Sequence, residues 1–243
     1  MAQLYVGTAG WSIPKTHASN FPRVSTQLER YAQVLTAVEI NSSFYRSHKP
    51  STYTRWAASV PDGFRFTVKM PREITHMRKL VDVAECLTRF LAEIEELGKK
   101  LGPVLVQLPP SLRYNEVAAL NFFESFRTKF AGGIACEPRH STWFTEAVNA
   151  RFEALHIARV VADPPVVPHA IEPGGNRKLL YLRLHGAPKI YYSPYGPEQI
   201  SKIAAVMRRA SDGAAACWCI FDNTALGEAT KDALDLVSRF ARP

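Results

Sequence analysis

The segment "YLRLHG", residues 181–186, decides how the rest of the chain is interpreted. Its first four residues are typical of a β-strand, and the glycine that follows the histidine ends that strand. Because successive side chains of a strand alternate between its two faces, Arg183 and His185 point to one side, and Leu182 and Leu184 to the other. An otherwise apolar strand therefore aims two cation-capable side chains at its carboxyl end.

Two kinds of partner could meet these two side chains. A carboxylate of the protein, such as Glu137 or Asp163, would form a structural ion pair with them. A ligand that enters at the strand end would instead be held by Arg183 through its charged group. His185, an imidazole with an ordinary pKa near 6.5, would then hydrogen-bond the ligand or move a proton. We predict that the partner of Arg183 and His185 is a ligand.

Length and composition bound the class of protein. With 243 residues the chain can bury a large core, and one domain over residues 1–243 is expected. No run of about 18 apolar residues occurs, which predicts no membrane contact through a spanning helix. The first residues enter a strand without a basic and then an apolar region, which predicts a cytoplasmic protein. The formal net charge of +8 favours anionic partners, although the basic residues are scattered.

Short apolar runs bounded by Gly or Pro alternate with longer helical patterns along the whole chain. The 3–4 periodic stripe from Leu87 to Leu101 is the clearest helical pattern. The connection over residues 164–178 contains too many Pro and Gly for a regular helix. The expected strands are Leu4–Thr8, Ala37–Asn41, Arg65–Lys69, Val104–Leu108, Gly133–Glu137, Ala158–Asp163, Leu179–His185 and Ala215–Phe221.

Eight βα units over this length predict an α/β fold, a (β/α)8 TIM barrel with an irregular sixth crossover. A doubly wound sheet is the alternative, but no G-x-G-x-x-G follows the first strand. In a (β/α)8 barrel the carboxyl ends of the strands carry the active site. The polar side chains that gather at these ends are Glu39, Asn41, Lys69, Gln107, Glu137, Arg139, Asp163, Arg183, His185, Asp222 and Asn223.

Several segments at these strand ends resemble, in order and spacing, those of one family. They are "GTAGW" at 7–11, "VEINSSFYR" at 38–46, "ITH" at 74–76, "LGPVLVQLPPS" at 101–111, "EPRHSTW" at 137–143, "LRLHG" at 182–186, "YYSPY" at 191–195 and "FDNTALGEAT" at 221–230. Over essentially the whole chain the sequence is similar to the YecE-like family, domain of unknown function 72. The resemblance implies a (β/α)8 barrel. It implies no reaction, because the comparison of this family with sugar isomerases is an analogy of fold. Asp222 is a departure, since the family more often shows a pair of asparagines there.

The first functional hypothesis is an enzyme of unknown reaction class that acts on a small anionic substrate, such as a phosphorylated or acidic sugar. Lys69, Arg139 and Arg183 would bind the anion, because their cationic groups suit phosphate or carboxylate. Aromatic side chains would wall the pocket and could stack on a sugar ring. The other residues expected at the substrate are Trp11, Asn41, Tyr45, Gln107, Trp143, Asp163, Tyr192, Tyr195 and Asn223.

The same hypothesis needs groups that transfer protons. Glu137 or Glu39 could act as the general base, and His185 or His76 as the acid. The alternative for Glu137 is structural, because Arg139 lies two residues further along the chain and buried charges are normally paired.

A second hypothesis adds a divalent metal in an isomerase-like enzyme. Glu137, Asp163, His185 and Asp222 come from strands five to eight, an arrangement like the metal set of xylose-isomerase-like barrels. Oxygen ligands with one imidazole suit magnesium or manganese. The neighbouring arginines would repel such an ion, so neither a metal nor another cofactor is expected.

A third hypothesis is a module that binds single-stranded nucleic acid or a nucleotide. Basic charge and aromatic side chains near one face would allow phosphate contacts and base stacking. No contiguous basic stripe and no RNA-binding motif occurs, so a small anionic ligand is the favoured partner. The oligomeric state stays open.

Overall fold

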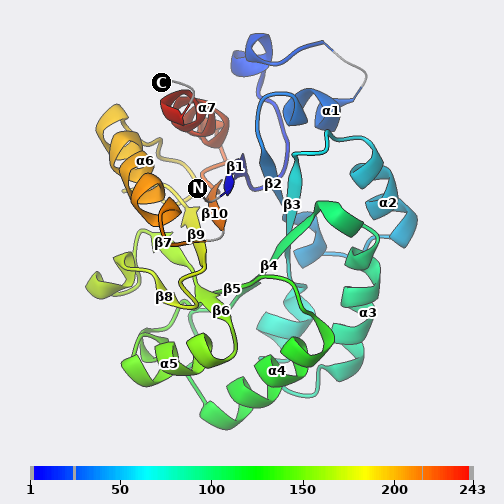
Figure 1. Ribbon diagram of the computed structural model, residues 1–243, viewed down its shortest axis with the longest axis vertical. Helices are drawn as coiled ribbons and strands as arrows, with labels where there is room; N and C mark the ends of the chain where they lie inside the picture. The colour runs from blue at the N-terminus through cyan, green and yellow to red at the C-terminus, as the bar shows by residue number, and fades with distance from the viewer. Residues whose placement is uncertain (1–2, 24–25, 215, 241–243) are drawn as a thin grey trace.

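A computed structural model describes residues 3–23, 26–214 and 216–240 of the chain, and all eight expected strands occur in it (Figure 1). The sixth expected strand is split in two around Val160, and Ala215, the first residue expected in the eighth, lies outside the described residues. The strands are β1 (Gln3–Thr8), β2 (Ala37–Ile40), β3 (Arg65–Lys69), β4 (Leu101–Gln107), β5 (Ile134–Glu137), β6 (Ile157–Arg159), β7 (Val161–Asp163), β8 (Gly174–Gly175), β9 (Leu179–Leu184) and β10 (Ala216–Phe221).

The strands pair in two sheets. One has the order β1-β10-β9-β7 and is parallel throughout, and the other has the order β2-β3-β4-β5-β6-β8 and is parallel except for the short β8. The single closed ring of paired strands that the sequence predicts is therefore not found among the described residues. The fold is a mixed α/β fold with two parallel sheets. The doubly wound alternative would have a single sheet, so it does not describe this chain.

The two sheets meet at both of their edges. At one edge the amide of Gly10 donates to the Glu39 carbonyl oxygen at 2.8 Å, and the Thr36 amide donates to Val6 at 3.2 Å. A Cβ on Gly7 would lie 1.9 Å from the carbonyl oxygen of Ala37, so only glycine allows this close approach. At the other edge β6 pairs with β5, while β7, which only Val160 separates from β6, pairs with β9.

Helices surround the strands on the outside (Figure 1). Side-chain caps begin several of them: Thr26 and Glu29 form a capping box before α1, and Asn115 and Thr145 cap α4 and α5. The connection over residues 164–178 has no α-helix, as predicted; a short 3₁₀ turn at Pro168–Ile171 takes its place. The helices are α1 (Gln27–Ala32), α2 (Pro50–Ala58), α3 (Ala84–Glu95), α4 (Glu116–Lys129), α5 (Glu146–Ala154), α6 (Pro197–Ser211) and α7 (Glu228–Phe240).

The apolar core has two parts, which follow from the alternation of side chains along the strands. The larger part lies between strands and helices and includes Leu182 and Leu184 of β9. The smaller part consists of strand residues and of Val160 between β6 and β7, and it includes Tyr181 of β9, packed with Trp218. The prediction that the leucines and the polar residues of this strand face opposite sides is therefore confirmed. Each helix in the described residues is too short or too polar to span a lipid bilayer.

Candidate functional site

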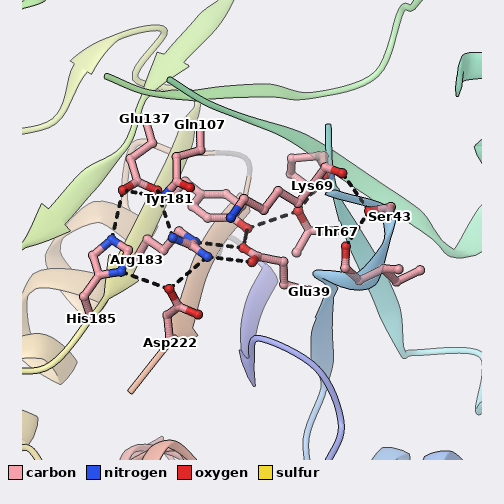
Figure 2. A network of polar contacts seen from close by, with 12 residues as sticks. Glu39, Ser43, Thr67, Lys69, Gln107, Glu137, Tyr181, Arg183, His185 and Asp222 are labelled. Atoms are coloured by element: carbon pink, nitrogen blue, oxygen red, sulfur yellow. Dashed lines mark hydrogen bonds and ion pairs between the residues drawn. The ribbon is translucent and has the colours of Figure 1, made fainter. Parts of the chain in front are cut away.

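Arg183 lies at the centre of a network of charged side chains at the carboxyl ends of the strands (Figure 2). Its Nε and Nη2 donate to the two carboxylate oxygens of Glu39 at 3.0 and 2.8 Å. Its Nη1 donates to Glu137 at 3.1 Å, and Nη2 lies 3.0 Å from Asp222. The side chain has no exposed surface. The prediction that Arg183 grips a ligand is corrected accordingly: its donors are occupied by three carboxylates of the protein.

His185 is buried between two of the same carboxylates. Its Nε2 lies 2.9 Å from Glu137 and its Nδ1 lies 3.0 Å from Asp222. Burial disfavours the imidazolium, but Glu137 and Asp222 outweigh it and raise the pKa of His185 above its ordinary value. Both ring nitrogens are therefore engaged within the protein, and His185 has no free nitrogen with which to contact a substrate.

Glu137 has more partners than any other carboxylate of the network. Besides Arg183 and His185, it accepts from Nε2 of Gln107, at 3.1 Å to each of its oxygens, and from Nη1 of Arg139 at 3.1 Å. Burial favours the neutral acid, but Arg183 and His185 hold the pKa of Glu137 well below its usual range. Such a carboxylate stays ionised and is a weak base. Arg139 is the outermost of these partners, since about a fifth of its side chain is exposed.

Lys69, the last residue of β3, differs from the other charged groups of the site. Only 6% of its surface is exposed, yet no described residue accepts a hydrogen bond from Nζ or pairs with it. Nζ lies over the ring of Phe44, 4.1 Å from the centroid. Burial and the charge of Arg183 lower the pKa of Lys69, although the carboxylates nearby oppose this.

His76 contacts the same aromatic ring. It belongs to a π-helical turn at Glu73–Met77, and its ring centroid is 4.9 Å from that of Phe44. Its Nδ1 is 2.9 Å from Oγ1 of Thr75, and no described residue bonds its Nε2. Burial, followed by the charge of Lys69, lowers the pKa of His76. The imidazole is therefore neutral at pH 7 and able to accept a proton.

Several residues that we expected to line the site are engaged elsewhere. Trp143 is buried in the core, where its Nε1 donates to the Leu112 carbonyl. Asp163 accepts a hydrogen bond from the Tyr195 hydroxyl at 2.7 Å, and this partly buried contact holds the loop after β9. Asn223 donates to Asp232 of α7 at 2.7 Å. The sequence placed these residues at strand ends, but side-chain packing turns them away from the network.

The remaining candidates lie at or beyond the rim of the network. Oδ1 of Asn41, just after β2, is buried without a hydrogen-bond partner. Trp11 is half-buried against Trp56, and Tyr45 and Tyr192 are exposed.

Sequence reasoning missed two aromatic residues of this region. Phe44 contacts both Lys69 and His76, and Tyr191 packs edge-on against His185 with 5.8 Å between the ring centroids. Burial and the charge of Asp222 raise the pKa of Tyr191. Tyr191 lies in the "YYSPY" segment, whose other two tyrosines were selected instead. Nothing in the sequence distinguishes the three.

The four residues of the metal hypothesis do not form one ligand set. Asp163 faces Tyr195, and the guanidinium of Arg183 occupies the space between Glu137 and Asp222. Within residues 3–23, 26–214 and 216–240, no group of three or more His, Cys, Asp or Glu side chains is arranged to hold a metal ion.

Related sequences share most of the chain. The family model described as "Protein of unknown function DUF72" matches residues 5–243. UPF0759 protein YecE of Escherichia coli K12 is 31% identical over 176 residues, which cover 70% of this chain and 62% of that protein. UPF0759 protein YunF of Bacillus subtilis is 27% identical over 208 residues, 76% of this chain and 71% of that protein. The match thus spans less than two thirds of the E. coli protein.

Solved structures share the fold. A DUF72 family protein of Thermotoga maritima superposes with a TM-score of 0.81 at 24% identity, covering 99% of this chain and all of that one. One from Enterococcus faecalis gives 0.81 at 21% identity, with 99% and 96% covered. A xylose isomerase-like TIM barrel/4-hydroxyphenylpyruvate dioxygenase fusion protein gives 0.52 at 14% identity, covering 97% of this chain and 42% of that one. The chain therefore belongs to the DUF72 family, the YecE-like family that its motifs resemble.

Proposed function

We propose that this protein is an enzyme that acts on a small anionic substrate at the carboxyl ends of its strands. The observation that carries the proposal is the buried charge network around Arg183, with Lys69 and Arg139 at its outer edge. Burying ionised groups costs several kcal/mol per ion, and a packed apolar core of the same volume is often as stable or more stable. Such a network is therefore better explained by a chemical role than by a structural one.

We further propose that the two sheets form one (β/α)8 barrel. In support, backbone hydrogen bonds join β1 to the β2 region, and the chain runs without a break from β6 in one sheet to β7 in the other. The similarity to the xylose isomerase-like TIM barrel/4-hydroxyphenylpyruvate dioxygenase fusion protein extends over 97% of this chain. In such a barrel the network lies on the face where active sites occur.

Each group of the site has a role in this proposal. Arg139 binds the anionic group of the substrate, because Nε and Nη2 of its half-buried guanidinium have no partner among the described residues. Arg183 and His185 hold Glu39, Glu137 and Asp222 in fixed positions and do not touch the substrate. His76, with a neutral imidazole and a free Nε2, transfers the proton.

Thermal unfolding in the presence of anions tests the role of Arg139. A ligand at a hundred times its dissociation constant adds about 2.7 kcal/mol, which for a domain of this size is roughly 5–10 °C in melting temperature. We expect inorganic phosphate to raise the melting temperature of the parent protein, and to do so much less for Arg139→Gln. The matched control is Arg151→Gln, which removes an arginine from an exposed ion pair with Glu116. Equal shifts in all three proteins, or no shift in the parent, would refute the anion site.

A groove beside the site gives the nucleic-acid hypothesis its one specific support. The groove has a volume of about 340 Å³ and is lined by Arg46, Arg72, Arg78 and Arg89, with Phe44 on the wall nearest the site. The last two of these arginines already pair with Glu73. Binding of a single-stranded oligonucleotide that weakens steeply with added salt, and is lost in Arg46→Gln with Arg72→Gln, would favour this function over the first.

A further inference from the structure

Lys69 is a charged side chain of the site whose Nζ has no hydrogen-bond or ion-pair partner among the described residues. In Figure 2 its side chain extends from β3 toward Arg183 and Gln107, while its backbone carbonyl accepts the Ser43 hydroxyl at 2.6 Å. The three carboxylates nearby are bound to Arg183. An ammonium group has three N–H donors, and burial that limits their acceptors costs free energy. Burial of Lys69 therefore shifts its equilibrium toward the neutral amine, which keeps a lone pair.

A second lysine provides an internal comparison. Nζ of Lys189 also lies 4.1 Å from the centroid of an aromatic ring, that of Tyr192. Lys189 is exposed, so water can hydrogen-bond its ammonium group. The two amines therefore share the cation–π geometry and differ in burial. Any difference in reactivity between the two amines can therefore be attributed to the surroundings of Lys69 in the site and not to the contact with an aromatic ring.

We propose that Lys69 is the nucleophile of this site and that it forms an imine with the carbonyl carbon of a small anionic aldehyde or ketone. The inference rests on the proposed function in one respect: Arg139 holds the anionic group of that substrate. The Nζ lone pair attacks the carbonyl carbon, and one proton moves from the nitrogen to the carbonyl oxygen to give a neutral carbinolamine. The hydroxyl then takes a second proton and leaves as water, and the nitrogen releases its other proton as the C=N bond forms. Water is the only by-product, and no electrons are gained or lost.

The position of His76 fits the proton transfers that this step needs. The amine and the imidazole both contact the ring of Phe44, at 4.1 and 4.9 Å from its centroid. The ring of Phe44 also shields one side of the amine from water. Because no residue in the described part of the chain bonds Nε2 of His76, this nitrogen can carry a proton to the departing hydroxyl and return it when the imine is hydrolysed.

Reductive labelling tests the nucleophile without knowledge of the natural substrate. The folded protein is treated at pH 7 with a limiting amount of formaldehyde and cyanoborohydride, and the modified lysines are mapped by mass spectrometry. We expect Lys69 to be labelled before Lys189, and its advantage to grow as the pH is lowered. Equal labelling of the two lysines, or slower labelling of Lys69, would overturn the inference.

A second carbonyl compound tests the substrate class. Dihydroxyacetone phosphate followed by borohydride should add the mass of the compound less one oxygen atom, at Lys69. The adduct should be lost in Lys69→Arg and in Lys69→Met, kept in Lys189→Arg, and reduced in Arg139→Gln. An adduct that survives Lys69→Arg, or no adduct in the parent protein, would contradict an imine with an anionic carbonyl compound.

The two proposals fail in different ways. If phosphate still raises the melting temperature of Lys69→Arg while the parent shows no preferential labelling, the anion site stands and the imine does not. If Lys69 is labelled preferentially but phosphate has no effect on the parent, the nucleophile stands and the anion site fails.

Discussion

The inward-facing side chains of the strands change character over a distance of two residues. On β2, Ala37 is followed by Glu39, and on β5, Ala135 is followed by Glu137. On β9, Tyr181 precedes Arg183. The lower region, which includes Ala37, Ala135 and Tyr181, is apolar and contains stacked aromatic rings. The upper region, at the carboxyl ends of the strands, is the network of buried charges around Arg183. The same strands thus supply a region that stabilises the fold and a region that costs free energy to bury.

Tyr181 joins the two regions. Its ring is stacked 6.3 Å from that of Trp218, which in turn stacks on Tyr5 at 4.4 Å. Its hydroxyl donates upward to Glu39 at 3.2 Å and lies 3.1 Å from the hydroxyl of Thr67. A polar group on a buried aromatic side chain needs such partners. The aromatic stack therefore positions the Tyr181 hydroxyl that hydrogen-bonds Glu39 of the charge network.

The largest effect should follow removal of the central cation. Arg183→Leu leaves three carboxylates close together without a counter-charge. Removing one partner of a buried pair costs about 3–5 kcal/mol, and we expect at least that loss in the free energy of unfolding, or failure to fold. Arg151→Leu, from an exposed pair with Glu116, should cost less than about 1 kcal/mol. Chemical denaturation measures both. Normal stability of Arg183→Leu would mean that the carboxylates do not depend on it.

An intermediate effect should follow a change in the lower region. Trp218→Leu keeps the site apolar but removes much of the stacked ring, so we expect a loss on the order of 2 kcal/mol, below the 3–5 kcal/mol typical of truncation to alanine. Because Trp218 lies below the network, the phosphate-dependent rise in melting temperature should persist. A loss of that rise in Trp218→Leu would show that the two regions are not separable.

The smallest effect concerns pH and should belong to the upper region alone. The pKa of His185 is raised in the folded protein, so its contribution to stability is complete below the unfolded value near 6.5 and is lost as pH rises through the folded value. The free energy of unfolding should fall over that alkaline interval in the parent protein and in Trp218→Leu. His185→Gln should reduce the dependence of the free energy of unfolding on pH over this interval. An unchanged slope in His185→Gln would assign the titration to another group.

Part of the site could be predicted from the sequence because it depends on neighbours along one strand. Alternation places Arg183 and His185 on one side, and the positions of the strands bring Glu137 and Lys69 to the same end. The partners of Arg183 could not be predicted. Glu39 is 144 residues away in the sequence, and no local pattern records which of the many strand-end carboxylates reaches it.

The sequence by itself determined the order of the elements, the family, and the side to which each strand residue points, because these depend on periodicity and on local turn and capping residues. Only the tertiary structure decided that Arg183 is saturated by carboxylates while Lys69 has none. It also decided that the sixth strand divides between two sheets. Those outcomes depend on contacts between strands far apart in the chain, where a difference of a few ångströms in side-chain reach determines which charged side chain is paired and which is not.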